Sequence, residues 1–265
     1  MGRCLYCERR DRLSEEHIIP LGLGGLLIVQ AASCPSCNRT TSAFELSVLR
    51  GFMAAARAVA GFPTRRPRER PSTVPVTLKR GSDAETHHVP LGSATALLPL
   101  PRFDTIGLFS GRPMGGDILL IGQETIRFGV DPQLMAASLG PGDVVLHGKW
   151  EIIPFARMLA KIGIGCVSSE LGSLPLADVP LLDFVHTGVT TGVSHWLGST
   201  HVEVAPELQG ATHVVSVHYR DHPIHRERRL AIARIRLFAN SGATGYEVVV
   251  LDSLRSAPVF AVAPG

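Results

Sequence analysis

Two cysteine pairs, Cys4-Leu5-Tyr6-Cys7 and Cys34-Pro35-Ser36-Cys37, enclose residues 14–25, which have the sequence SEEHIIPLGLGG. Four thiolates in two such pairs can close a tetrahedral zinc site, and zinc held by four protein ligands is structural because no position is left for water. The spacer between the pairs is long enough for a hairpin. The sequence therefore predicts a small unit stabilised by zinc, with four reduced, metal-free cysteines as the alternative.

The segments that follow the first pair predict two strands and a helix. Residues 17–19 form a short apolar run, and residues 26–31 form a second one that predicts a strand. A helix should begin near Pro35, with Ser33 as its cap, and continue with apolar residues at helical spacing to Val59. Gly51 should bend or divide this helix.

The remaining sequence divides into a linker and a larger part. Residues 63–72 begin PTRRPRERP, with three prolines, four arginines and no residue for a core, so they predict an extended linker that could contact phosphate. Residues 73–265 alternate short strand-like runs with one helical stripe at 152–162. We expect an α+β protein with a zinc-held unit at 1–62, the linker at 63–72 and an α+β domain of unknown function at 73–265.

Specific elements are expected in this larger part. Strands are predicted at 74–78, 118–121, 125–130 and 143–146, and a hairpin at 230–239 and 246–251. Arg157 and Lys161 should lie on the polar face of the helix, and Cys166 should be a buried small apolar residue after a glycine-containing turn. Histidines at 218, 222 and 225 are expected in loops rather than at a metal.

Composition and charge restrict the class of protein. The chain has 265 residues, of which 45% are hydrophobic and 18% charged, as in a soluble globular protein of one or two domains. No export signal is evident, and no apolar stretch approaches the roughly 18 residues that a membrane span needs. A cytoplasmic protein is therefore predicted. Residues 1–72 carry eleven arginines, no lysine and six acids, a balance of +5, against −2 for the remaining residues. This charge suits a polyanion, although a solvated basic surface would explain it equally well.

The polar residues between the cysteine pairs suggest a second metal and a hydrolytic role. One oxygen ligand from Glu16 and one from Asn38 would suit Mg²⁺ or Mn²⁺, which keep several waters and accept phosphate oxygens. A neutral imidazole at His17 could act as the general base for a water nucleophile. Arg39 could contact a substrate phosphate. The alternatives are that Asn38 caps the helix and that Arg39 is an exposed helix residue.

The segments CLYC, SEEHIIPLGLGG and CPSCNRTTSAFE together resemble the HNH endonuclease family, whose ββα-metal motif is often held by two such cysteine pairs. The resemblance covers residues 3–50. It implies that Glu16 and Asn38 bind the catalytic metal, that His17 is the general base, and that double-stranded DNA is cut to 5′-phosphate and 3′-hydroxyl ends. Two features depart from the family: residues 26–29 are LLIV where an asparagine is usual, and the acidic ligand is Glu rather than Asp.

The sequence thus predicts a DNA endonuclease that hydrolyses phosphodiester bonds with a histidine base and one Mg²⁺. The alternative is a non-catalytic zinc ribbon that binds nucleic acid and is fused to a regulatory or assembly domain. Residues 73–265 could also mediate self-association into a homo-oligomer.

Overall fold

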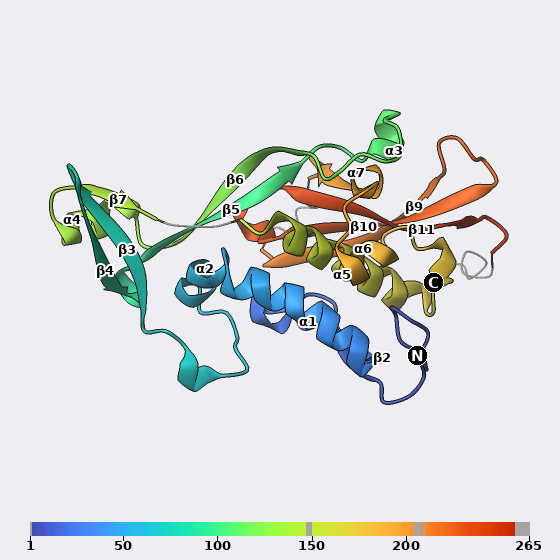
Figure 1. The fold of residues 1–265 in the computed structure, drawn as a ribbon, viewed down its shortest axis with the longest axis horizontal. Coiled ribbons are helices and arrows are strands. Elements are labelled where there is room, and N and C mark those ends of the chain that lie inside the picture. Colours follow the sequence, from blue (N-terminus) through green and yellow to red (C-terminus); the bar gives the residue numbers. More distant parts are fainter. Residues whose placement is uncertain (1, 147–149, 204–207, 209, 258–265) are drawn as a thin grey trace.

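The computed structural model describes residues 2–146, 150–203, 208 and 210–257, and it has the mixed α+β composition that the sequence predicts. Figure 1 shows a body that contains both described ends of the chain and a smaller lobe at one end, joined to the body by a long two-stranded ribbon. The cysteine pairs and the helix that follows them lie in the body.

The N-terminal unit is a hairpin followed by a helix. Strands β1 (Ser14–His17) and β2 (Ile28–Ser33) are antiparallel, with His17 opposite Ile28. Helix α1 (Pro35–Arg50) follows directly, and α2 (Ala54–Val59) comes after a break at Gly51. The predicted division of the helix at this glycine is confirmed, while the second strand begins two residues later than expected.

The expected cap of α1 was wrong. Cys34 is the residue at the N-cap, its backbone is extended, and no side chain caps the helix. Ser33 instead ends β2 and is fully buried. Pro35 occupies the first helical position, where its missing N–H costs nothing, so the helix can begin without a serine cap.

The body is built on an antiparallel sheet in the order β8-β11-β10-β9. The predicted hairpin is confirmed as β10 and β11, which pair along most of their length. The strands are β8 (Leu197–Thr200), β9 (His213–Asp221), β10 (Arg228–Leu237) and β11 (Gly245–Leu254).

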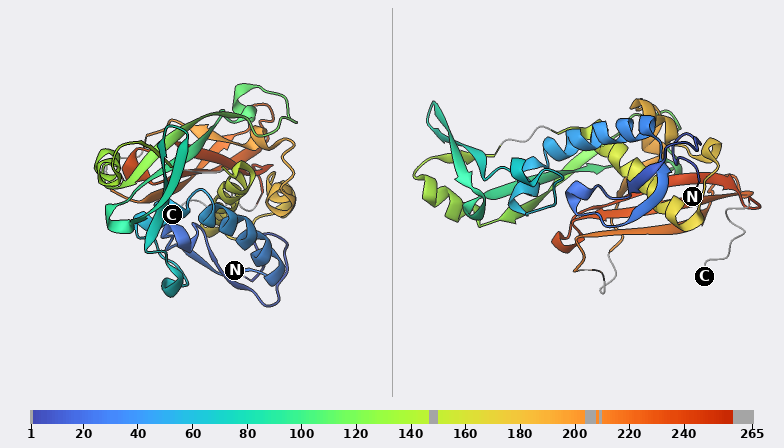
Figure 2. Two further views of the ribbon diagram at one scale, coloured as in Figure 1. Left: turned by 60° about the vertical axis from the view of Figure 1, so that its left-hand side comes forward. Right: turned by 90° about the horizontal axis from the view of Figure 1, so that it is seen from below.

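Helix α5 (Ile152–Leu171) lies on this sheet and is longer than predicted. Figure 2 shows α1 and the hairpin on one side of α5 and the sheet strands on the other. Gly163 and Gly165, expected in a turn, lie inside the helix. A Cβ at Gly165 would come within 3.3 Å of the Ile18 side chain, so the missing side chain lets α5 approach the segment after β1.

Helix α5 also corrects two other expectations. By length and composition it is apolar enough to cross a membrane, contrary to the expectation from the sequence, but 72% of its most apolar window is buried, as in the core helix of a soluble protein. Its supposed polar face is not solvated: the Lys161 side chain is 1% exposed, and Arg157 donates to the carbonyl oxygens of Val185 and His186. The cytoplasmic location stays a prediction.

The smaller lobe has its own apolar cluster. Its three strands have the order β4-β3-β7, and Val74, Val76 and Met135 are buried between this sheet and α4. The strands predicted at 74–78 and 143–146 are confirmed, whereas the two predicted at 118–121 and 125–130 form one strand, β6, which begins at Leu120 and ends at Gly129. These elements are β3 (Thr73–Arg80), β4 (Asp83–Pro90), α4 (Pro132–Leu139) and β7 (Asp143–Val145), with the ribbon formed by β5 (Thr95–Phe103) and β6 (Leu120–Gly129).

Short helical segments complete the described fold. The α-helical ones are α3 (Gly107–Ser110), α6 (Leu182–Thr187) and α7 (Val193–Trp196). The 3₁₀ segments are η1 (Leu21–Leu23), η2 (Pro67–Glu69), η3 (Leu91–Ser93), η4 (Leu176–Asp178) and η6 (Ala239–Ser241).

The N-terminal unit and the sheet share one hydrophobic core. Phe52, in the turn between α1 and α2, packs edge-on against Phe155 of α5 with ring centroids 5.7 Å apart, and Phe155 packs against Tyr246 of β11. The segment 63–72 is mostly exposed and contains only the single turn η2. Residues on both sides of this linker therefore stabilise each other by direct burial of apolar surface.

Candidate zinc site and neighbouring ion pairs

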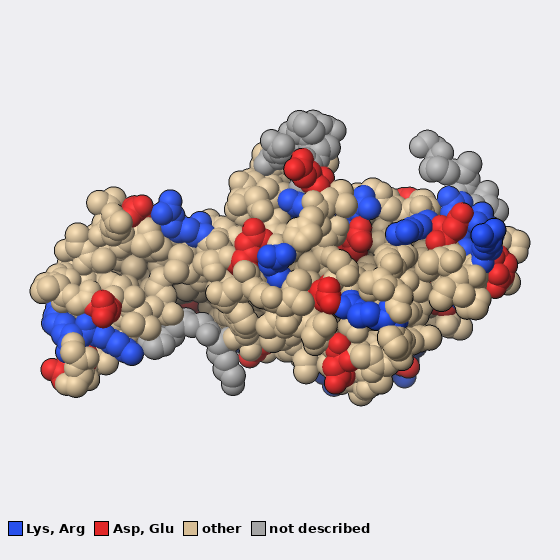
Figure 3. Space-filling view, turned by 90° about the horizontal axis from the view of Figure 1, so that it is seen from above, with Lys and Arg blue, Asp and Glu red and all other residues tan. Residues whose placement is uncertain are grey.

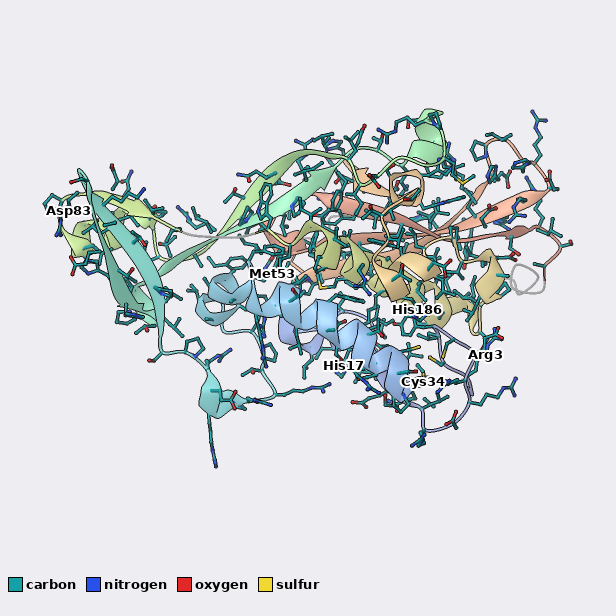
Figure 4. The ribbon with its side chains drawn as sticks, viewed as in Figure 1. Arg3, His17, Cys34, Met53, Asp83 and His186 are labelled. Atoms are coloured by element: carbon teal, nitrogen blue, oxygen red, sulfur yellow. The ribbon has the colours of Figure 1, made fainter. Side chains whose placement is uncertain are left out.

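The four N-terminal cysteines come together at one point. Their Sγ atoms all lie within 4.8 Å of one another, and Cys7 Sγ is 3.5 Å from Cys34 Sγ. This spacing suits one Zn²⁺ with bonds of about 2.3 Å to each sulfur. Figure 4 shows Cys34 and the sulfur atoms beside it where the N-terminal segment meets the start of α1. The predicted four-cysteine cluster is confirmed, and its donor set fits a structural zinc ion.

Backbone contacts hold the first cysteine pair against the hairpin and helix. The Cys4 N–H donates to the Arg9 carbonyl at 2.7 Å, and the Leu5 N–H donates to the Ala32 carbonyl at 2.8 Å. From α6, the Nε2 of His186 donates to the Tyr6 carbonyl at 2.8 Å. The pair is therefore fixed by β2 on one side and by the larger part of the chain on the other.

The thiols differ in how readily they ionise. Burial raises the pKa of Cys4. Burial also acts to raise the pKa of Cys34, but hydrogen bonds with Ser36 and the Cys37 backbone outweigh it and lower the value to about 6. A thiolate is the form that binds metal, so the hydrogen bonds to Cys34 favour the form that zinc requires.

A second charged group lies beside this site. We call Lys161, Glu16, Glu45 and Tyr6 the lysine centre. The Lys161 Nζ lies 2.6 Å from Glu16 Oε1 and 2.9 Å from Glu45 Oε1, and the two carboxylates come from β1 and α1. The same ammonium donates to the carbonyl oxygens of His17 and Ile18. Lys161 of α5 thus contacts both the hairpin, through Glu16, and helix α1, through Glu45.

Charge in the lysine centre is not balanced. One ammonium serves two carboxylates, and their side chains are 6% exposed for Glu16 and 17% for Glu45. Burial would lower the pKa of Lys161, but the two carboxylates raise it above its ordinary value. Burial raises the pKa of Glu45 despite the nearby ammonium. Burial, together with Glu16 and Glu45, also raises the pKa of Tyr6.

Three buried polar atoms of the lysine centre have no hydrogen-bond partner within the described part of the chain: the Tyr6 hydroxyl, Glu16 Oε2 and Glu45 Oε1. Of these, Glu45 Oε1 has the ion pair with Lys161 at 2.9 Å. Burying polar groups without a partner costs free energy of folding. The lysine centre therefore does not simply stabilise the fold.

The residues predicted to bind Mg²⁺ have different surroundings. Glu16 is 5% exposed and its carboxylate already bonds to an ammonium. Asn38 lies in the first turn of α1, partly exposed, and its Oδ1 accepts a hydrogen bond of 3.4 Å from Ser42. His17 ends β1, partly exposed, and Figure 4 shows it beside α1. This arrangement gives the Mg²⁺ expectation no support.

Sequence reasoning missed Lys161 and Glu45. A lysine among apolar residues of a buried helix indicates that an acidic partner is buried beside it, because an isolated buried charge is costly. Glu45 follows Asn38 by seven residues, two turns along α1, and so could have been placed on the same face.

Exposed arginines surround the zinc site. Arg9, Arg10 and Arg12 follow the first cysteine pair, Arg39 follows the second, and all four are exposed. We call them the knuckle arginines. Arg39, predicted as a phosphate contact, has the exposure that this role requires.

Two other predictions concern groups far from the cysteines. His222 accepts hydrogen bonds at Nδ1 from the backbone of Ile224 and His225, so it stabilises a turn, while His218 lies on β9 and not in a loop. Within the described ranges, the four cysteines are the one group of three or more His, Cys, Asp or Glu side chains spaced to share an ion. Cys166 is buried as expected, and burial raises its pKa to about 11.

Comparison of the chain with protein-family models, with curated proteins and with solved structures finds no match in any of the three. The resemblance of residues 3–50 to HNH endonucleases therefore stays a prediction based on the motif residues.

Proposed function

We propose that this chain is a nucleic-acid-binding protein whose zinc-held hairpin and helix contact the phosphate backbone without cutting it. The observation that carries the proposal is the ion pair between Glu16 and Lys161, at 2.6 Å. It bears on catalysis because Glu16 is the residue that a hydrolytic metal would need.

A divalent cation at Glu16 would compete with an ammonium already in contact with the same carboxylate. Lys161 is 1% exposed and also bonds to Glu45, so it has no solvent to move into without breaking both ion pairs. Displacing it from Glu16 would break one of its two buried ion pairs, at a cost of several kcal/mol. The absence of an asparagine at residues 26–29 argues in the same direction.

Phosphate binding is supported by the knuckle arginines. Guanidinium groups bind phosphate oxygens in a bidentate manner and stay charged at any physiological pH. Arg9, Arg10 and Arg39 have no acidic partner among the ion pairs of the described residues, so their charge is available to a ligand. Double-stranded DNA is the default partner, and zinc at the cysteines would give these side chains a rigid support.

Hydrolysis of DNA is the second candidate. The order of strand, strand and helix around the cysteines, together with the partial exposure of His17 at the end of β1, is what favours it. Both candidates predict binding to DNA, and only the second predicts cleavage.

The test measures binding and cleavage with the full zinc-loaded chain. Fluorescence anisotropy of a labelled duplex over a salt series should show binding that weakens with salt. The triple substitution R9A/R10A/R39A should reduce the salt slope by about two to three units, since each phosphate contact contributes about 0.9. The matched control, K79A/R80A/R127A, removes three exposed charges from the smaller lobe and its ribbon and should leave the slope nearly unchanged.

Plasmid nicking distinguishes the two candidates. We expect no nicking in Mg²⁺ or Mn²⁺ by protein that binds the same DNA. Nicking by the wild type that is abolished in H17A, with zinc content unchanged, would replace our proposal with the endonuclease. Failure to bind duplex or single-stranded DNA or RNA at low salt would overturn both.

A further inference from the structure

A groove of about 500 Å³ lies beyond the C-terminal half of α1, away from the cysteines. Its walls come from α1, α2, the η1 segment and the linker. Five arginines line it, Arg50, Arg57, Arg65, Arg66 and Arg70, and we call it the arginine groove. Its volume falls within the range of roughly 300–1,000 Å³ that is usual for small-molecule sites.

The positive charge of the arginine groove is largely unmatched. Of its two acidic residues, Glu69 pairs with Arg66 at 3.2 Å and Glu45 pairs with Lys161. The other four arginines make no ion pair with any described residue. By contrast, on the face that carries β6 and α3, basic and acidic side chains lie beside one another (Figure 3).

Arg57 fixes the shape of the groove. Its guanidinium donates to the carbonyl oxygens of Gly22 at 2.6 Å, Leu49 at 2.8 Å and Pro63 at 3.3 Å, so it joins η1, α1 and the start of the linker. Burial lowers the pKa of Arg57, and the neighbouring charges of Arg70 and Arg50 lower it further. The positive charge of Arg57 is therefore held near those of Arg50 and Arg70 by hydrogen bonds to uncharged carbonyl oxygens. A bound anion would stabilise this arrangement.

The residues of α1 that line the groove change from polar to apolar to basic along the helix. Ser42 and Glu45 supply polar acceptors, Leu46 and Leu49 supply an apolar surface, and Arg50 supplies charge. These five residues lie on one face of the helix, and the distance from the first to the last is eight steps of about 1.5 Å, or about 12 Å. Leu46 is 43% exposed, so its apolar surface is open to a ligand.

We propose that the arginine groove binds a nucleotide, with its phosphate on the arginines and its base against Leu46 and Leu49. The ligand carries a phosphate group and, beyond a sugar, a flat ring whose faces can pack on leucine, which matches the arginines and leucines that line the groove. This unit could be a free nucleotide or the 5′-phosphorylated end of a strand. The site uses none of the knuckle arginines, so it does not depend on the function proposed above.

Calorimetric titration of the zinc-loaded full chain tests the assignment with four probes. They are ADP, pyrophosphate, a 5′-phosphorylated hexanucleotide and the same hexanucleotide with a 5′-hydroxyl. We expect saturable binding of ADP, tighter than that of pyrophosphate because the base adds contacts. Comparison of ADP with the two oligonucleotides identifies the source, since only a strand-end site would prefer the phosphorylated hexanucleotide over both.

Substitutions locate the binding. R50A/R65A should weaken ADP binding by at least tenfold, because it removes two charge-assisted contacts. R68A is the matched control: Arg68 lies in the same exposed linker but does not line the groove, and its substitution should change affinity by less than about twofold. L46S should weaken ADP binding severalfold and leave pyrophosphate binding unchanged.

Each remaining outcome would overturn the proposal. Equal affinity for pyrophosphate and ADP would reduce the groove to a general anion site. Unchanged ADP binding in R50A/R65A would place the ligand elsewhere. No saturable binding of ADP or the phosphorylated hexanucleotide, by protein with normal zinc content and melting temperature, would exclude a nucleotide site.

Discussion

The lysine centre and the arginine groove share one residue, Glu45, and have opposite charge balances. In the lysine centre two buried carboxylates share one ammonium. In the arginine groove five guanidinium groups lie near one carboxylate, that of Glu69, which is not paired elsewhere. The first imbalance is enclosed by protein and the second is open to solvent. Buried charge is costly to expose or to leave without its counterion, whereas exposed charge left unmatched is available for a ligand.

Zinc removal should produce the largest effect on this comparison, because zinc at the four cysteines would join residues 4–7 to the start of α1, the helix that carries Glu45. We expect a chelator, or C37S, to lower the free energy of unfolding by at least about 5 kcal/mol, since structural zinc binds with about 10–16 kcal/mol in small domains. Thermal unfolding with parallel zinc quantification measures this. A protein that loses zinc but keeps its melting temperature would show that the cysteines do not stabilise the unit.

K161M tests the lysine centre and should have the next largest effect. Removing the ammonium leaves Glu16 and Glu45 buried without a counterion, which should cost about 3–5 kcal/mol in urea unfolding. K79M, at an exposed lysine, is the control and should stay within about 0.5 kcal/mol of the wild type.

A second variant separates charge from packing at Lys161. Because K161M/E16Q/E45Q removes all three charges together, it should recover part of the stability lost in K161M. If the triple variant were less stable than K161M, the loss would come from packing, and the comparison of the two charge balances would fail.

G165A should have a smaller effect. An added methyl would come within 3.3 Å of the Ile18 side chain, which is fully buried, and so would press α5 away from the segment that bonds to Lys161. We expect a loss of about 1 kcal/mol, since overpacking costs about 1–3 kcal/mol and alanine regains about 1 through helix propensity. G92A, where no atom lies within 4 Å of the new methyl, should be nearly neutral. Equal stability of both variants would mean that α5 does not need this close approach.

The pH dependence of E45Q should be the smallest effect. The folded protein raises the pKa of Glu45, so the protonated carboxyl favours folding and that contribution is lost as the pH rises above the ordinary value of 4.5. The unfolding free energy of E45Q, minus that of the wild type, should therefore increase between pH 4 and pH 8 in urea titrations. E69Q, at an exposed acid, is the control. A difference that decreases with pH would show that ionised Glu45 is stabilised by Lys161 more than burial opposes it.

The sequence allowed the metal site and its local elements to be predicted. The spacing of the cysteines, the proline at the start of α1 and the glycine that divides α1 from α2 are all local features of the sequence. Local features can be interpreted without knowing which distant residues are in contact. Strands with alternating residues, such as β10, could be predicted for the same reason.

The lysine centre could not be predicted, because it depends on contacts between distant residues. Lys161 has helical neighbours that are nearly all apolar, and periodicity alone placed it on the opposite, solvated face. Its partner Glu16 had been assigned to a metal on motif grounds, and only the packing of α5 against β1 shows that a lysine contacts it. Gly163 and Gly165 were similarly mistaken for a turn, because close helix packing and turns both use glycine.

The ion pair from Glu16 to Lys161 spans 145 positions of the chain, and this has a consequence for synthesis on the ribosome. At about 5–20 residues per second, the N-terminal hairpin emerges on the order of ten seconds before the helix that supplies its counterion. During that interval both carboxylates remain hydrated and the half-built core is open to water. The native burial of the hairpin has to await α5, so a chain whose synthesis ends between the two would keep an uncovered apolar surface.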